Sequence, residues 1–491
     1  MIKTSGKRCN WLRSVGLTML ICAGTLLAGN GTGELAQAGT AVQQAAVLTA
    51  AIHEPVIPRG KTFMVTDFGA VSGDNKDDLP AFVQAVAAAS AGGGGIVEVP
   101  AGHYYLAGPL TLKSHIELHL ADGAVMEFSH RPQDYEKHIV LTRFECTECY
   151  NYSPFIYANG EEDIAITGSG SDRQGTIDGS GEAWWPWVGA SVWKNCYPNQ
   201  QEDSAKLKDM GNDDVPVEQR IFGRGHYLRP ILIQPYGSQR ILIRGIRVKD
   251  SPMYNISPAL CKDVIIDHVT IQAAGPNTDG VDPDACENVW IKDSLFETGD
   301  DCIAIKAGRD NDGRRVGRPS RNIVIERNLF KNGHGGVTMG SEIAGGVDHV
   351  YSLYNVMDSP NLNWAYRLKT NSQRGGGVTD FYAYGDPVQS VGRAVLTVDM
   401  AYDGGDVGGY TPDIHGLHME KLTVNAHHRP LATVFTYARN PVYDFTWKDC
   451  TITDAGTSGG QIFQLTDTPA ANIQLTDMTI NGKSRSGNAV F

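Results

Sequence analysis

Short runs of β-branched and aliphatic residues, separated by glycine, asparagine and aspartate, fill most of the chain after residue 95. Apolar and polar residues alternate in runs such as 96–99 and 116–120, which predicts short strands with one buried face. A single helix is predicted before them, beginning near Asp77 and Asp78 and ending before the glycines at 92–95. The pattern therefore favours an all-β chain with one helix near its start.

The apolar runs repeat one sequence plan along the chain. Runs of this plan begin at Ile241, Val264, Val289, Ile323, Ile414, Val442 and Ile473. The first three separations are 23, 25 and 34 residues, and the longest is explained if the charged stretch 308–318 is a loop inserted into one coil. Strands repeating at this period without helices predict a right-handed parallel β-helix, a solenoid with the early helix covering the strand edges at one end. The alternative fold is a β-sandwich with regularly spaced strands.

The amino terminus has the pattern of a secretory signal. Basic residues precede an apolar run over residues 15–28, and Ala36-Gln37-Ala38 offers small residues for cleavage. The run is shorter than the roughly 20 residues of a spanning helix, so no membrane anchor is expected. We predict a signal peptide over 1–38, a secreted or periplasmic protein, an N-terminal extension over 39–62, and one catalytic β-helix domain over 63–491.

Composition and charge narrow the classes of partner. The 491 residues carry a net charge of −13, which argues against nucleic acid as a partner. Seven of nine cysteines follow residue 38, an odd number, so at least one thiol is unpaired within the chain. Cys146 and Cys149 alone do not supply a zinc site, and neither a metal nor a cofactor is expected. The protein is expected to be a monomer.

Four short segments occupy similar points in successive coils. They read Asn-Thr-Asp-Gly from residue 277, Gly-Asp-Asp-Cys from 299, Gly-His-Gly-Gly from 333 and Arg-Leu-Lys from 367. Neighbouring rungs of a sheet lie about 4.8 Å apart, so a solenoid aligns the polar side chains of these segments in one file. The file consists of Asp279, Asp300, Asp301, His334, Arg367 and Lys369. Asp282, Asp284 and Glu326 are expected to be solvated or structural.

This file suits the hydrolysis of an acidic glycoside. One protonated carboxyl must protonate the leaving oxygen, and a carboxylate must activate water or attack carbon. Crowding of like charges raises one pKa, and His334 can tune that balance. Arg367 and Lys369 alternate on a strand and can face an anionic sugar. Two structural alternatives remain: the aspartates as turn residues, or Asp300 and Asp301 as calcium ligands, as in solenoid lyases.

The four segments resemble the signatures of polygalacturonases, glycoside hydrolase family 28, with Leu368 in place of isoleucine as the one departure. The similarity extends to the amino-terminal stretches 66–70 and 99–102. The resemblance implies an inverting hydrolase in which Asp300 is the general acid and His334 supports it. Asp279 and Asp301 are then expected to hold the attacking water. Asn277, Arg367 and Lys369 are expected to bind the sugar.

The resemblance also implies the substrate, a pectic polysaccharide or oligogalacturonide. Residues 181–228 carry several tryptophans and are interpreted as long loops that close the groove, as in bacterial exo-acting members. Endo-polygalacturonase and rhamnogalacturonan hydrolase are the alternatives within the family. Outside it stand a calcium-dependent pectate lyase and a non-catalytic pectin-binding solenoid. Carboxyls on adjacent rungs, about 5 Å apart, would suggest retention rather than inversion.

Overall fold

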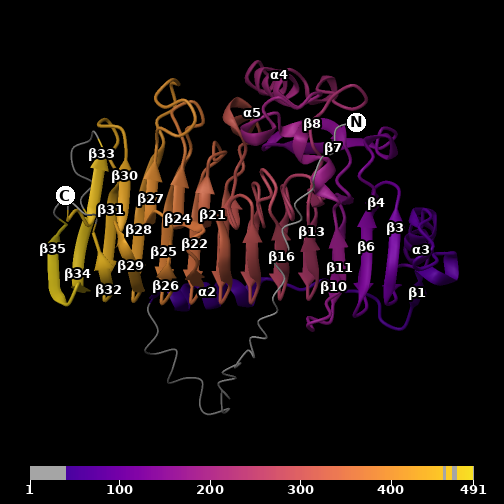
Figure 1. The fold of residues 1–491 in the computed structure, drawn as a ribbon, viewed down its shortest axis with the longest axis horizontal. Coiled ribbons are helices and arrows are strands. Elements are labelled where there is room, and N and C mark those ends of the chain that lie inside the picture. Colours follow the sequence, from indigo (N-terminus) through magenta and orange to yellow (C-terminus); the bar gives the residue numbers. More distant parts are fainter. Residues whose placement is uncertain (1–39, 457–459, 467–472, 490–491) are drawn as a thin grey trace, which may run out of the picture.

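A computed structural model describes residues 40–456, 460–466 and 473–489, and the predicted signal peptide lies outside them. Thirty strands form one continuous sheet that winds into a parallel β-helix (Figure 1). Consecutive coils pair in parallel: Ile241 lies opposite Val264, and Val264 opposite Val289. The predicted solenoid is therefore confirmed, and its repeats stack in the register that the sequence plan predicts.

Three stacks of strands form the faces of the solenoid. The first contains β2 (Gly95–Val99), β5 (Ile116–Leu120), β10 (Glu162–Gly168), β13 (Gln239–Arg244), β15 (Lys262–Asp267), β17 (Glu287–Lys292), β20 (Ser320–Glu326), β22 (Val347–Leu353), β25 (Gly377–Tyr384), β28 (Asp413–Glu420), β31 (Tyr443–Lys448) and β34 (Ile473–Ile480). The second contains β3 (Gly102–Leu106), β6 (Ala124–Phe128), β11 (Thr176–Asp178), β14 (Arg247–Lys249), β16 (Thr270–Ala273), β18 (Leu295–Thr298), the start of β21 (Leu329–Gly340), β23 (Val356–Asp358), β26 (Pro387–Ser390), β29 (Thr423–Arg429) and β32 (Thr451–Ala455).

The third stack carries the candidate site. Its strands are β4 (Leu110–Thr111), β9 (Ile156–Asn159), β12 (Ile233–Tyr236), β19 (Ile303–Ile305), the end of β21, β24 (Leu362–Lys369), β27 (Ala394–Asp399), β30 (Ala432–Phe435) and β33 (Phe463–Thr466). Isolated bridges at Ile256 and Val281 continue the stack between β12 and β19. At the two ends, β1 (Thr62–Met64) pairs with β2, and β35 (Lys483–Asn488) runs antiparallel to β34.

A buried polar ladder lines the turn between the first and second stacks. The side-chain oxygen of Asn328 accepts the Ser294 amide, that of Asn355 accepts the Asn328 amide, and Asp386 accepts the Asn355 amide. The residues just before them in the chain, among them Asp293 and Arg327, adopt left-handed backbone angles. The ladder satisfies turn amides that the winding removes from water.

The helix prediction is correct for α3 and otherwise incomplete. α3 (Leu79–Ala91) lies at the amino-terminal end of the stack and buries Phe82 and Ala85; its capping role stays a prediction (Figure 1). Among the described residues, three further α-helices are α2 (Thr40–Ala51), α4 (Gln201–Asn212) and α5 (Asp310–Val316). They lie in the predicted extension and in the two predicted loops. α4 buries Leu207 as its one large apolar side chain, so it lacks an amphipathic stripe.

The insertions gather over the third stack around a hairpin of β7 (Ile139–Phe144) and β8 (Thr147–Tyr152) (Figure 1). A separate apolar cluster joins them: Phe144, Cys149, Leu207, Phe222, Leu228, Ile231, Met253 and Tyr254. Trp184 is fully buried against Tyr135 and Phe155. This tryptophan therefore anchors the insertion to the core and does not face the groove.

All seven cysteines from Cys146 onward are free in the structure. Six of them are buried, and Cys196 is partly exposed. No helix within the described ranges is long and apolar enough to cross a bilayer.

Candidate active site

The four sequence segments meet on adjacent rungs of the third stack. The Asn255 amide donates to the Asp279 carbonyl at 3.0 Å, and the Gly280 amide donates to the Asp301 carbonyl at 3.0 Å. The next rung follows through Cys302, whose amide donates to the Gly335 carbonyl at 2.8 Å. Carboxylate oxygens of Asp279, Asp300 and Asp301 all lie within 4.8 Å of one another. Winding thus brings together three carboxyls that are 22 residues apart at most in the chain.

Gly335 makes this close approach possible. A Cβ atom at this position would lie 2.2 Å from Oγ1 of Thr338 and 3.0 Å from Oδ1 of Asp301. Neither neighbour is free to move, because Thr338 is buried in β21 and Asp301 is held by ion pairs. Glycine is therefore required in the Gly-His-Gly segment for steric reasons.

Asp301 is a fully buried carboxylate held between two cations. Lys369 Nζ lies 2.8 Å from its Oδ2, and Arg367 Nη1 lies 3.1 Å from its Oδ1. Burial raises the pKa of Asp301, but Lys369 and Arg367 more than offset this and hold it well below its usual range. The two cations predicted to bind the sugar thus contact Asp301 here. Lys369 also lines the cavity described below.

Asp300 is paired with His334. The imidazole Nδ1 lies 2.8 Å from Asp300 Oδ1, and the His334 amide donates to the Asp300 carbonyl. Burial raises the pKa of Asp300, but the His334 hydrogen bond and charge outweigh burial and lower it. The same hydrogen bond raises the pKa of His334. Each member of the pair therefore favours the charged form of the other.

Asp279 is the site carboxyl that favours the protonated form. Burial, followed by the charge of Asp300, raises the pKa of Asp279 to about 8. Asp282 lies behind it and is buried rather than solvated, and neither of its carboxyl oxygens has a hydrogen-bond partner among the described residues. Burial raises the pKa of Asp282 well above its ordinary value. Burial and, after it, the charge of Asp300 thus both favour the protonated form of Asp279, while the retention of a proton by crowding stays a prediction.

Asp279 and Asp300 line a cavity of about 220 Å³, and the fully buried Asp301 is not among its lining residues. It is lined by Glu145, Lys208, Tyr254, Asn277, Asp279, Asp300, Lys306, Arg309, Ser341, Glu342, Lys369, Tyr402 and Asp403. Three lining residues come from the insertions: Glu145 from the β7–β8 hairpin, Lys208 from α4 and Arg309 from the 308–318 stretch. Lys208 Nζ lies 3.1 Å and Arg309 Nη1 2.7 Å from a Glu145 oxygen. The insertions therefore form one wall of the cavity.

A buried ionic network around Glu342 lines the same cavity and reaches Glu145 through Arg309. The Glu342 carboxylate forms ion pairs with the side-chain nitrogens of Lys306 at 3.1 Å, Arg374 at 3.4 Å and Arg309 at 3.5 Å. Burial raises the pKa of Glu342, yet these cations lower it well below its usual value. The sequence analysis missed this network. A cation directly after the apolar strand 303–305 was the available signal for Lys306.

Asn277, a predicted sugar ligand, is fixed by a residue that the sequence analysis also missed. Buried Arg229 donates to Asn277 Oδ1 at 2.6 Å and to the carbonyl of Pro276 at 2.7 Å. Asn277 adopts a left-handed backbone angle, φ 55°, at the turn into the Asp279 rung. Its oxygen is engaged, so its amide nitrogen is the group that can meet a ligand in the cavity.

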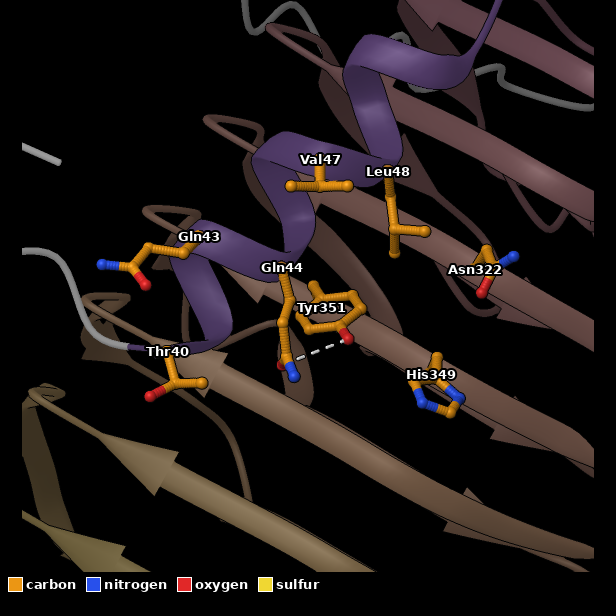
Figure 2. Close-up of a pocket in the computed structure, with 8 residues that line it drawn as sticks. All are labelled: Thr40, Gln43, Gln44, Val47, Leu48, Asn322, His349 and Tyr351. Carbon is orange, nitrogen blue, oxygen red and sulfur yellow. Dashed lines mark hydrogen bonds between the residues drawn. The ribbon is translucent and has the colours of Figure 1, made fainter.

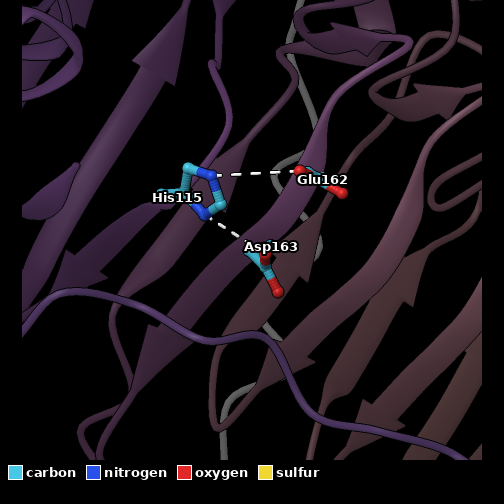
Figure 3. A group of neighbouring side chains, drawn as sticks. All are labelled: His115, Glu162 and Asp163. Carbon is cyan, nitrogen blue, oxygen red and sulfur yellow. Dashed lines mark ion pairs between the residues drawn. The ribbon is translucent and has the colours of Figure 1, made fainter. Parts of the chain in front are cut away.

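A groove beside α2 and a His-Glu-Asp cluster on the first stack are less suited to catalysis than the carboxylate site. A groove of about 460 Å³ beside α2 is lined by glutamine, threonine and aliphatic side chains with His349 (Figure 2). His115, Glu162 and Asp163 form a cluster on the first stack (Figure 3), but Arg240 binds both carboxylates. The aspartates of the site likewise have cationic partners at Asp300 and Asp301, which disfavours the calcium alternative.

The comparisons with known sequences agree with this geometry. The family model described as glycosyl hydrolases family 28 matches residues 224–484. A probable polygalacturonase of Vitis vinifera is 31% identical over 351 residues, 69% of this chain and 63% of the grape protein. An exo-poly-alpha-D-galacturonosidase of Dickeya chrysanthemi is 23% identical over 87% of this chain and 68% of its own length. The chain thus spans less than two thirds of the grape relative.

The solved structures extend the similarity over nearly the whole chain. A hyperthermoactive exopolygalacturonase from Thermotoga maritima superposes with a TM-score of 0.83 at 36% identity, covering 92% of this chain and 99% of that chain. A polygalacturonase from Erwinia carotovora superposes with a TM-score of 0.57 at 21% identity, covering 87% and 98%. The second similarity concerns the fold alone.

Proposed function

Since the chain belongs to glycosyl hydrolases family 28, we propose that it hydrolyses α-1,4-galacturonosyl linkages of pectin or polygalacturonate from the chain end. The observation that carries the proposal is the three-carboxylate cluster beside Arg367 and Lys369. A carboxyl that retains its proton, a carboxylate held ionised and local cations are what the hydrolysis of an acidic glycoside requires.

The proposed mechanism assigns one role to each carboxyl. Asp300 protonates the leaving oxygen, and Asp279 with Asp301 orients the attacking water. Burial and then the charge of Asp300 raise the pKa of Asp279 to about 8, so Asp279 is the carboxyl that favours this proton in the free site. Because the two groups are coupled, moving this proton to Asp300 leaves Asp279 ionised and able to accept a proton from water. His334 stabilises Asp300 while it is ionised.

Inversion is part of the proposal. It requires water between Asp279 and Asp301 on one face of the sugar, with Asp300 on the other. Measuring by NMR the anomer first released from oligogalacturonide tests it. A product with the configuration of the substrate would contradict inversion and would support the retaining reading of the short carboxylate spacing.

Action at the chain end is proposed from the wall formed by Lys208 and Glu145. An insertion that reaches the cavity restricts it to about 220 Å³, whereas an open groove would bind an internal stretch of polymer. The similarity to the Thermotoga exopolygalacturonase supports this choice. Digestion of polygalacturonate with sizing of early products tests it. Monomer or dimer from the first time point is expected, and a rapid fall in viscosity with mixed products would refute it.

Export is proposed from the residues before the described part of the chain. Residues 1–38 have the order of basic, apolar and small residues that a secretory signal needs. A pectic polysaccharide is encountered outside the cell, which agrees with this localisation. Mass spectrometry of the mature amino terminus checks the predicted cleavage after Ala38.

A further inference from the structure

A second, larger cavity continues the third stack on the carboxy-terminal side of the site. It has a volume of about 550 Å³ and is lined by Trp364, Arg393, Ala394, His428, Arg429, Pro430, Thr433 and Gln464. Trp364, Ala394, Thr433 and Gln464 belong to β24, β27, β30 and β33 of the third stack, whereas His428 and Arg429 form the end of β29. The chemistry proposed above does not use this cavity.

The cavity is continuous with the catalytic file. Gly335 pairs with Trp364, and Trp364 pairs with Ala394, so each step moves one rung away from Asp301. The Arg367 guanidinium, which binds Asp301, lies 4.6 Å from the centroid of the Trp364 ring. The Arg393 guanidinium lies 4.9 Å from the same ring. An unbroken row thus runs from the catalytic carboxylate through Trp364 to Arg393.

The basic side chains of this cavity are available for an anion. Arg393 and Arg429 are exposed, and neither guanidinium forms an ion pair with a residue in the described ranges. Leu396 pairs with Ala432 on the next rung, and Arg393 and Arg429 line the same cavity just before these paired segments. Two unpaired like charges on neighbouring strands repel in the absence of an anion. Stacking on Trp364 occupies only the face of Arg393, so its N–H edge stays free for a carboxylate.

The insertions favour one direction for a long substrate. The β7–β8 hairpin and α4 lie over the amino-terminal half of the solenoid (Figure 1), and Glu145 and Lys208 from them line the catalytic cavity. A polymer with its end in that cavity would then extend along the carboxy-terminal rungs, past Arg367 and Trp364. The chain as a whole carries −13, so local arginines are needed there to hold a polyanion.

We propose that the groove lined by Trp364, Arg393 and Arg429 binds uronate residues of the leaving chain and so makes the enzyme prefer long galacturonans. Trp364 offers a half-buried aromatic edge to a sugar ring, and the two arginines bind successive carboxylates. This inference rests on the proposed function and adds the length of substrate that the site recognises.

The test compares substrates of different length on one enzyme preparation. kcat/KM is measured for digalacturonate and for oligogalacturonates of six or more units, with wild type, Arg393→Ala, Arg429→Ala and the double variant. The ratio of long to short kcat/KM is expected to fall about three- to tenfold per arginine at low ionic strength. Arg321→Ala is the matched control, because Arg321 is an exposed arginine on β20 of the first stack and should leave all rates unchanged.

The outcomes separate the two proposals. If wild type cleaves no galacturonide, the proposed function fails and the inference fails with it. If wild type cleaves digalacturonate and the length ratio is the same in the double variant, the inference alone fails. Added salt should reduce the long-chain preference of wild type towards that of the double variant, whereas a salt effect of equal size in both would also overturn the inference. Trp364 is left intact, because it contacts Arg367.

Discussion

At the scale of single residues, the ionisation of each carboxyl in the site is set by its immediate neighbours. Asp301 contacts two cations that favour its ionised form, Asp300 contacts an imidazole, and Asp279 lies beside the buried Asp282, whose pKa is raised by burial. The aspartates have identical side chains, so the surrounding cations and burial produce the differences. Each role therefore responds to substitution of a partner as well as of the aspartate itself.

The role of Asp300 can be isolated by changing the leaving group. Asp300→Asn is expected to lower kcat on polygalacturonate by about 10²–10⁴-fold, since general acid catalysis typically contributes that much. On an aryl galacturonide with an acidic phenol as leaving group, the loss should be less than about tenfold, because little protonation is needed. Steady-state kinetics on both substrates provide the measurement.

Asp279→Asn supplies the contrast in that experiment. A residue that orients water is needed whatever the leaving group, so this variant should lose activity on both substrates. Equal losses for Asp300→Asn on the two substrates would contradict the acid assignment. Thermal unfolding of each variant shows whether the fold is retained.

At the scale of elements, the turns between strands carry buried polar groups of their own. The ladder of Asn328 and Asn355 ends at Asp386, which is fully buried and accepts from the Asn355 amide and the hydroxyls of Ser352 and Tyr366. Burial raises the pKa of Asp386 to about 7 despite these three donors. Asparagine occupies the two preceding positions of the ladder, whereas this position has Asp386, a carboxyl with a pKa near neutral pH.

Asp386→Asn is expected to remove a pH dependence of stability. The folded protein binds the Asp386 proton more tightly than the unfolded chain, whose carboxyl titrates near 4. This contribution to stability is therefore complete below about pH 4 and is lost as the pH rises towards 7. The free energy of unfolding of wild type should fall by about 2–4 kcal/mol more than that of the variant when the pH is raised from 4 to 8. Urea denaturation at both values measures this difference.

Asp172→Asn is the matched control, because Asp172 is exposed in a surface loop. It should show the same pH dependence as wild type. An unchanged pH dependence in Asp386→Asn would show that Asp386 is not the titrating group.

The wall formed by α4 depends on a single large anchor. Leu207 is 1% exposed within the cluster that joins α4 to β8. Leu207→Ala should weaken that attachment by about 2–5 kcal/mol and let longer products appear early in a digest of polygalacturonate. Product sizing measures the change, and Val192→Ala, at an 81% exposed position of the same insertion, should behave as wild type. Unchanged early products from Leu207→Ala would contradict the role of α4 as a wall.

At the scale of the whole molecule, sequence reasoning succeeds where repetition carries the information. The spacing of the coils predicted that Asp279, Asp300, Asp301 and His334 would meet. They occupy similar positions in successive sequence repeats, and successive repeats form neighbouring rungs. Glu342, which joins the site through irregular backbone after β21, has no such pattern. α2 could not be predicted to lie on the first stack, because its contacts are with strands more than 200 residues away. Non-periodic contacts leave no trace in a single sequence.

α2 bridges several coils, and its docking can be tested. Ala45 is 1% exposed against a cluster that contains Val324 and Tyr351. Ala45→Arg should displace the helix and lower Tm by about 2–5 °C. The activity should be unchanged because α2 lies away from the third stack. Ala46→Arg, at an exposed position of the same helix, is the control, and equal Tm values for the two variants would show that α2 contributes no stability.

The docking of α2 also has a consequence for biosynthesis. The helix leaves the ribosome among the first segments, but the surface that receives it, on β17, β20, β22 and β25, is completed only after residue 384 has been made. Until then the binding site of the helix lacks β25 and, with it, Tyr384. Closure of this contact is therefore a late event in folding, which keeps the chain incompletely folded while it is still being elongated.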